Sequence, residues 1–181
     1  ASVAGPPADA PRRTTARSGY VMDAVELTEF SARVRDFLEE RWAEWFKEKG
    51  VQPPSSLSLG MCRFSSLFLS RALEHEFGGE WLVEGGTPQD EYGAPVLEGG
   101  IRVANGSWTP HYWVSDGDWE FIIDITADQF GLPAVQVIDS EAAHYRVNYS
   151  EGEVADHLRD VSWRVDQWLD RWRSAAPGLV T

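Results

Sequence analysis

The sequence has 181 residues, 43% hydrophobic and 25% charged, a composition that suits one globular domain. The formal net charge of −13 disfavours binding to nucleic acid or to an anionic membrane surface. A single cysteine excludes an intramolecular disulfide, and no apolar run is long enough to span a bilayer. We therefore expect a soluble, cytoplasmic protein that has no nucleic-acid or membrane partner.

Residues 1–21 are rich in Ala, Pro, Arg and Thr and nearly free of large apolar side chains. They cannot bury enough surface to become ordered, and they lack the apolar centre of a secretory signal. We expect a flexible Pro/Arg-rich tail. The remaining residues, 22–181, are expected to form a single domain.

Three segments have the apolar spacing of amphipathic helices. The first is predicted from about residue 23 to the breaker Gly50, and the second covers about residues 61–77. The third follows Ser150, which forms a predicted capping box with Glu153. Two of these helices precede the middle of the chain and one follows it.

Short β-like runs separated by Gly, Pro and Asp fill the middle of the chain. They read WLVEGG, GIRVANG, HYWVSD, WEFIIDIT and AVQVID, and the turn at residues 116–118 predicts a hairpin. Segregated helices and antiparallel-looking strands indicate an α+β fold rather than an alternating α/β fold.

The chain's cysteine, Cys62, lies at the predicted start of the second helix, after the breaker-rich segment PPSSLSLG. Unpaired N–H groups and the positive end of the helix dipole favour a thiolate at such a position. The same N–H groups can hold the oxyanion of an attacked carbonyl group. A lone cysteine is more often a small buried hydrophobe, so its partners decide between the two interpretations.

His111 begins the run HYWV, in which strand alternation places His111 and Trp113 on one face. A nucleophilic thiol needs a base of near-neutral pKa within hydrogen-bond reach, and an imidazole can serve. The competing interpretation is a histidine that is satisfied by a local hydrogen bond.

Asp124 is flanked by isoleucines in the run IIDIT, so its carboxylate is expected to be buried and to need a partner. The predicted hairpin places its strand beside the strand of His111. Asp124 would then hold the imidazole tautomer and orient the ring toward the thiol. The competing interpretation is that Asp124 only caps a turn with Thr126.

The motifs G-M-C at 60–62, H-Y-W-V at 111–114 and I-D-I-T at 123–126 occur in an order that resembles one known family. They resemble the transglutaminase-like branch of the papain-like cysteine enzymes. The resemblance covers roughly residues 55–139. It implies a papain-like core in which a nucleophile helix packs on an antiparallel sheet, flanked by N- and C-terminal helices.

Carried over residue by residue, the resemblance makes Cys62 the nucleophile, His111 the base and Asp124 the orienting acid. Residues 22–181 would then be a single catalytic domain. Met61 stands where transglutaminases usually have glutamine, and no acidic cluster has calcium-loop spacing. A calcium-activated cross-linking enzyme is therefore not expected.

Four further residues are candidates for oxyanion or substrate binding. Papain-like enzymes use a glutamine upstream of the cysteine, so Gln52 is one candidate oxyanion donor, and Ser58 and the Cys62 backbone N–H are alternatives. Trp113 is a candidate for the wall of a substrate groove. Gln129 either lines the site or caps a turn.

The other histidines offer weaker hypotheses. One cysteine and four scattered histidines do not have the clustering of a zinc site, and we expect neither a metal nor a cofactor. His75 lies too far along the nucleophile helix to be the base, and His144 and His157 are expected to be surface or edge residues. His144 is the rival of His111, because a loop can bring it back to the cysteine.

The pattern favours a cysteine-dependent hydrolase that cleaves an amide or peptide-type bond through a thioester. It would be a peptidase, amidase or deamidase whose substrate is a peptide, a protein or a small amide. If an amine replaced water, the same triad would make a transglutaminase-like acyltransferase. The alternative from another class is a catalytically inactive binding module with an acidic, Trp-rich surface. Thiol reactivity distinguishes this module from the enzymes.

Overall fold

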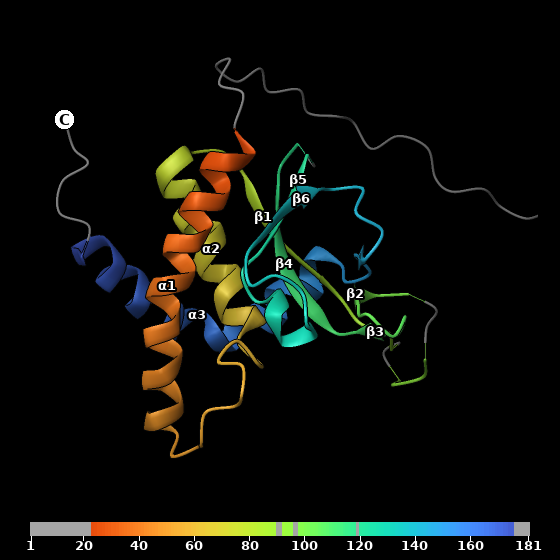
Figure 1. Cartoon of the computed structure of the whole chain (residues 1–181), viewed down its shortest axis with the longest axis horizontal. Helices are drawn as coiled ribbons and strands as arrows, with labels where there is room; N and C mark the ends of the chain where they lie inside the picture. The colour runs from red at the N-terminus through yellow and green to blue at the C-terminus, as the bar shows by residue number, and fades with distance from the viewer. Residues whose placement is uncertain (1–22, 90–91, 96–97, 119, 176–181) are drawn as a thin grey trace, which may run out of the picture.

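The computed structural model describes residues 23–89, 92–95, 98–118 and 120–175, which form a mixed α+β fold. Figure 1 shows two of the α-helices beside the antiparallel strands and the third, drawn in blue, running behind them. The predicted tail at residues 1–21 lies outside the described residues. None of the described helices is both long and apolar enough to cross a membrane.

Helix α1 spans Ala24–Glu48 and begins at the expected place. The Asp23 carboxylate caps it by accepting a hydrogen bond from the Val25 N–H at 2.9 Å. The Thr28 hydroxyl donates to the Ala24 carbonyl within the helix at 2.7 Å.

Helices α2, Cys62–Phe77, and α3, Glu151–Ala175, pack against each other. The predicted capping box of α3 is confirmed, because the Ser150 N–H donates to the Glu153 carboxylate at 2.7 Å. The Glu153 N–H reaches back to the Ser150 hydroxyl at 3.3 Å. The apolar stripe of α3 faces inward through Val154, Leu158, Val161, Val165, Trp168 and Leu169.

The main sheet has the strand order β1-β4-β5-β6, and every pairing in it is antiparallel. These strands are Trp81–Gly86 (β1), His111–Asp116 (β4), Phe121–Asp124 (β5) and Gln136–Asp139 (β6). A smaller sheet of order β3-β2-β7 contains Trp108–Thr109 (β3), Gly100–Arg102 (β2) and Tyr145–Arg146 (β7). A 3-10 turn, η1 at Ala127–Phe130, follows β5.

The two faces of the main sheet contact two different hydrophobic cores. The face that carries Val114 and Ile123 packs on the helices. The opposite face contributes Trp113 and Ile122 to a smaller core that includes Tyr145 of β7. The start of β4 and the end of β5 therefore lie where the helical layer, the main sheet and the smaller sheet meet.

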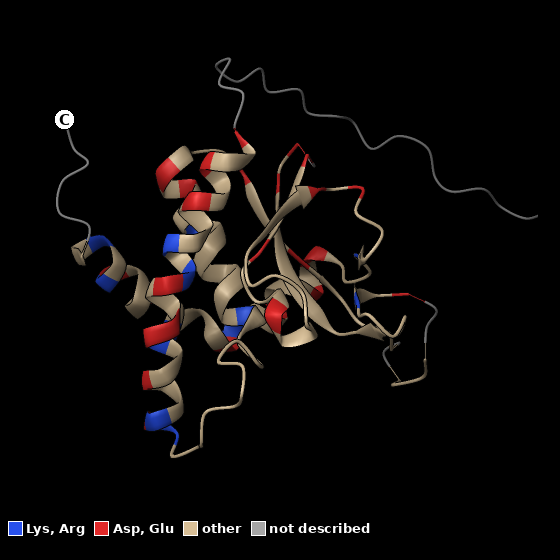
Figure 2. Cartoon of the chain, in the orientation of Figure 1, with Lys and Arg blue, Asp and Glu red and all other residues tan. Residues whose placement is uncertain are grey.

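Charged side chains of both signs follow one another along α1 (Figure 2). Two ion pairs link this helix to α3: Arg164 with Glu48, at 2.7 Å, and Arg171 with Glu44, at 2.8 Å. The glutamate of each pair is exposed to solvent, and ion pairs with an exposed partner contribute little free energy. The apolar contacts between the helices and the sheet therefore provide most of the stability.

Candidate active site

His111 and Asp124 meet across the β4–β5 hairpin. The antiparallel register pairs Val114 with Ile123, which brings the start of β4 beside the end of β5. His111 Nε2 lies 2.6 Å from Asp124 Oδ2, and both side chains are buried. The pair is a short, charge-assisted hydrogen bond that is shielded from water.

Both oxygens of the Asp124 carboxylate are saturated. Oδ1 accepts from the Thr126 N–H at 2.8 Å and the Thr126 hydroxyl at 3.1 Å. Oδ2 accepts from His111 and, at 2.8 Å, from the Tyr145 hydroxyl. Burial by itself raises the pKa of Asp124, but the His111 charge and these hydrogen bonds outweigh it and lower the pKa. Asp124 is thus a carboxylate that both caps a turn and holds the imidazole.

The second ring nitrogen of His111, Nδ1, does not bind Asp124. Nδ1 is buried and has no hydrogen-bond partner of normal geometry among the described residues. Burial by itself lowers the pKa of His111. The Asp124 carboxylate and the nearby Cys62 sulfur raise this pKa by more than burial lowers it, so the net shift is upward. Because Asp124 occupies Nε2, Nδ1 is the nitrogen that remains for the thiol.

Cys62 is the first residue of α2, and its side chain is partly exposed rather than sealed in the core. No side-chain cap covers this helix end in the described structure, since the N-cap residue Met61 makes no such hydrogen bond. Gly60 has a φ of +78°, a conformation that favours glycine. The sulfur therefore lies at a helix start that has no side-chain cap, where backbone N–H groups favour an anion.

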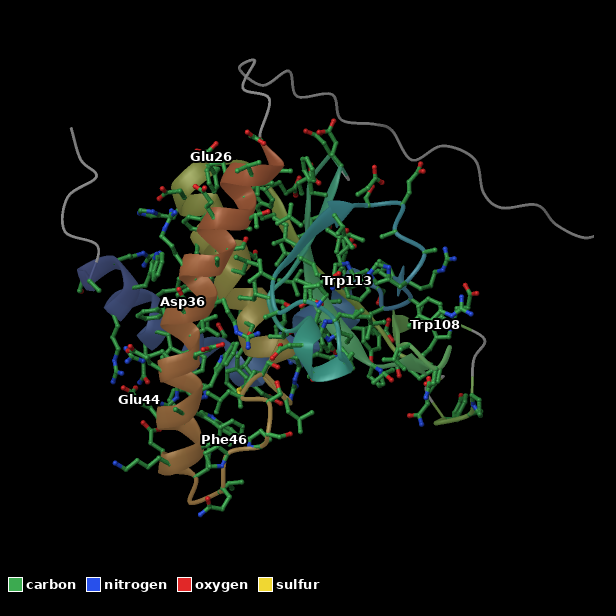
Figure 3. All side chains as sticks on the ribbon, viewed as in Figure 1. Glu26, Asp36, Glu44, Phe46, Trp108 and Trp113 are labelled. Carbon is green, nitrogen blue, oxygen red and sulfur yellow. The ribbon has the colours of Figure 1, made fainter. Side chains whose placement is uncertain are left out.

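Aromatic rings hold the imidazole in place. The His111 ring meets Phe130 edge-on, with centroids 4.8 Å apart. Trp113 lies 6.2 Å from the same ring and packs edge-on against Tyr145 at 5.1 Å. Trp113 is only 1% exposed and lies among the side chains of the main sheet. Trp108, on β3, lies farther toward the edge of the molecule (Figure 3). Trp113 thus packs beside the His111 ring and does not line an open groove.

The three remaining candidates occupy different surroundings. Gln52 is exposed in the loop after α1. Ser58 is fully buried and its hydroxyl lies 2.7 Å from that of Ser56, so it fixes the loop before α2. Gln129 on η1 donates to the Thr126 carbonyl at 2.9 Å and approaches the Gly60 N–H at 3.5 Å. The Gln129 side chain thus connects the acid's segment with the nucleophile's segment.

His144 and His157 do not bind Asp124. The His144 ring lies tilted against the Tyr145 ring, with centroids 4.7 Å apart, and it is the Tyr145 hydroxyl that donates to Asp124. His157 is half-buried, and its Nδ1 lies 2.6 Å from the Tyr112 hydroxyl. Across the described part of the chain, no three acidic, histidine or cysteine side chains gather into a group that could hold a metal ion.

A surface hollow of about 630 Å³ lies between α2 and α3, well along α2 from Cys62. Its lining includes Arg71, Glu74, His75, Asp166 and Asp170. Arg71 and Asp166 form an ion pair, and the lining contains no cysteine or serine. The hollow therefore lacks the nucleophile that the His111 site has.

Two residues of the site were not predicted from the sequence. Tyr145 reaches Asp124 from β7, and Gln136 Nε2 donates to the Tyr145 hydroxyl at 2.9 Å. Gln136 interrupts the apolar run AVQVID, and a polar residue in a buried strand is a usable signal for a hydrogen-bond network. Tyr145 has no comparable local signal.

Comparisons with known proteins give no relative from which a role could be transferred. No family model matches the sequence, and no curated protein or solved structure is significantly similar to it. The function therefore has to be argued from the residues of the site.

Proposed function

We propose that this protein is a cysteine-dependent hydrolase that cleaves an amide or peptide-type bond through a thioester intermediate. The single observation that supports it most is the buried 2.6 Å bond between His111 and Asp124, with the other imidazole nitrogen left for Cys62. The Cys62 sulfur lies close enough to His111 to raise the pKa of its imidazole, which supports a thiol–imidazole pair.

In the proposed acylation, the Cys62 thiolate attacks the carbonyl carbon of the substrate and forms a carbon–sulfur bond. The electron pair of the carbonyl moves to oxygen, and N–H groups at the start of α2 stabilise the oxyanion. The oxyanion then collapses, the carbon–nitrogen bond breaks, and protonated His111 delivers its proton to the leaving amine. The thioester and a neutral imidazole remain.

In the proposed deacylation, neutral His111 removes a proton from water, and the resulting hydroxide attacks the thioester carbonyl. The carbon–sulfur bond breaks, the carboxylic acid leaves, and the thiolate and imidazolium are restored. Asp124 stays ionised throughout because its hydrogen bonds lower its pKa. Its task is to fix the ring and stabilise the imidazolium.

We also propose that the core is papain-like, in its transglutaminase-like form. Three features support this: the nucleophile begins a helix, that helix packs on an antiparallel sheet, and the base and acid lie on neighbouring strands. Helices α1 and α3 then correspond to the flanking N- and C-terminal helices.

The experiment that tests the proposal is iodoacetamide alkylation of Cys62 as a function of pH, followed by intact-mass spectrometry. We expect rapid alkylation well below about pH 8, the range in which an ordinary thiol is mostly protonated. His111→Ala should slow it strongly at low pH, whereas His144→Ala, the matched control, should not. Equal rates in the wild type and His111→Ala would refute the triad and favour a binding module.

Acyl-type electrophilic probes then identify the chemistry. A probe that acylates Cys62 and is released over time as the free acid supports hydrolysis. Release mainly as an amide, when an amine is added, supports acyl transfer instead.

A further inference from the structure

Arg35 is a buried cation on the inner face of α1, and only 6% of it is exposed. Its guanidinium lies over the Trp42 ring, 4.7 Å from the centroid, and binds Asp128 with two hydrogen bonds of 2.8 and 3.0 Å. It also binds Glu39 at 2.8 Å. A buried guanidinium is costly unless its donors are satisfied, so the position of Arg35 requires an explanation.

One branch of these contacts leads to the acid of the site. Arg35 Nη1 donates to the Ile125 carbonyl at 2.6 Å. The N–H of the same peptide unit belongs to Thr126 and donates to Asp124 Oδ1 at 2.8 Å. One rigid peptide plane thus separates the guanidinium from the carboxylate. Donation to its carbonyl also strengthens the hydrogen bond that its N–H makes.

The other branch leads to the nucleophile. Asp128, held by Arg35, accepts a hydrogen bond from the Ser56 hydroxyl at 2.9 Å. Ser56 in turn contacts the buried Ser58 hydroxyl at 2.7 Å. The Ser58 carbonyl accepts from the Met61 N–H at 2.9 Å, directly before Cys62. The loop that presents the thiol is therefore tied to the same guanidinium as the turn that presents the carboxylate.

We propose that Arg35, together with Asp128, is a positioning residue that fixes Cys62 and the His111–Asp124 pair relative to each other. This inference rests on the proposed function, which supplies the reason why the two segments must be held in register. The link from Arg35 to Asp124 can be tested whether or not the protein is an enzyme.

The opposing explanation is that Arg35 and Asp128 are an ordinary buried ion pair that matters only for stability. Arg41 is the matched control because it also lies on α1 and its guanidinium covers an aromatic ring, Phe37, at 5.1 Å. Its ion pairs, however, are made with Glu40 and Glu44 of the same helix. Arg41→Met therefore removes a similar side chain without touching the site.

The test compares the wild type, Arg35→Met, Arg35→Met/Asp128→Asn and Arg41→Met in the full chain. The rate of Cys62 alkylation is measured across pH, and urea denaturation gives the free energy of unfolding. The downfield proton resonance of the short His111–Asp124 hydrogen bond reports on the pair directly. The double variant removes the Asp128 charge that the single variant leaves unpaired.

We expect Arg35→Met to slow alkylation at about pH 6.5 by roughly tenfold or more, since small misplacements of reacting groups have effects of this size. The His111 resonance should shift or broaden. The double variant should recover unfolding free energy but not the alkylation rate, and Arg41→Met should stay within about twofold of the wild type.

Two results would overturn the inference. One is an unchanged alkylation profile and His111 resonance in Arg35→Met while the unfolding free energy falls. The other is a double variant that recovers stability and reactivity together. If instead the wild-type thiol reacts independently of His111, the proposed function fails, and the resonance still tests whether Arg35 positions the pair.

Discussion

The Tyr145 hydroxyl donates to the same Asp124 oxygen that binds His111, at 2.8 Å. It belongs to β7 of the smaller sheet, so this bond joins the two sheets at the candidate site. Tyr145→Phe removes the donor and leaves Gln136 without its acceptor. We expect a loss of about 2 kcal/mol in unfolding free energy and an upward shift of the Asp124 pKa.

Urea denaturation measures the loss, and the pH profile of Cys62 alkylation measures the effect on the site. A Tyr145→Phe protein that is as stable as the wild type would show that the bond contributes nothing.

Asp124→Asn should change the dependence of stability on pH. The raised pKa of His111 stabilises the fold below about pH 6.5, and this contribution is lost as the pH rises through the raised value. The lowered pKa of Asp124 stabilises the fold above about pH 4, and this contribution is lost as the pH falls. The stability lost in Asp124→Asn should therefore be greatest between about pH 4 and 6.5.

Urea titrations at a series of pH values, with the exposed Asp118→Asn as control, give this difference directly. A deficit that stays constant from acid to alkaline pH would mean that the pair is not charged in the folded protein.

Glu84 should destabilise the folded protein when it is ionised, whereas ionised Asp124 stabilises it. It lies on β1 opposite Trp113, and burial raises its pKa to about 7, although Ser115 and Trp113 lower it somewhat. The folded state therefore holds this proton more tightly than the unfolded chain, so Glu84 lowers stability as the pH rises from about 4.5 to 7. Glu84→Gln should stabilise the protein more at pH 8 than at pH 4. Melting temperatures at the two pH values measure this, and an equal shift at both would refute it.

Two tryptophans of α3 should differ sharply in their contribution to stability. Trp168 is 2% exposed in the main core, so Trp168→Ala should cost about 3–5 kcal/mol. Trp163 is 55% exposed and lies under the Arg164 guanidinium, so Trp163→Ala should cost less than about 1 kcal/mol. Thermal and urea unfolding of both variants measures the contrast. Similar losses would contradict the inward orientation of the α3 stripe.

Much of the fold was predictable because local signals agree with it. The apolar spacing and the Ser150–Glu153 box define α3, and the hairpin signal after β4 correctly joins His111 to Asp124. Two-residue strands have no such signal, which is why β7 and its Tyr145 were missed. Their position depends on pairing across β2, a contact distant along the chain.

Other parts of the site have no local sequence signal. The role of Gln52 was inferred from a family pattern and stays a prediction; its side chain is exposed in the loop after α1. Arg35 lies within an apolar helical stripe, where a cation is unusual, but its acceptors are about ninety residues away in the chain. No periodicity argument identifies partners at that separation.

The sulfur is carried by a helix, while the imidazole and the carboxylate are carried by a sheet. The candidate chemistry thus depends on two rigid bodies staying in contact. A small separation of α2 from the main sheet, well short of denaturation, would already move the Cys62 thiol away from the His111 imidazole. Thiol reactivity should therefore disappear at a lower urea concentration than helical circular dichroism, which makes Cys62 an early reporter of loosening in this fold.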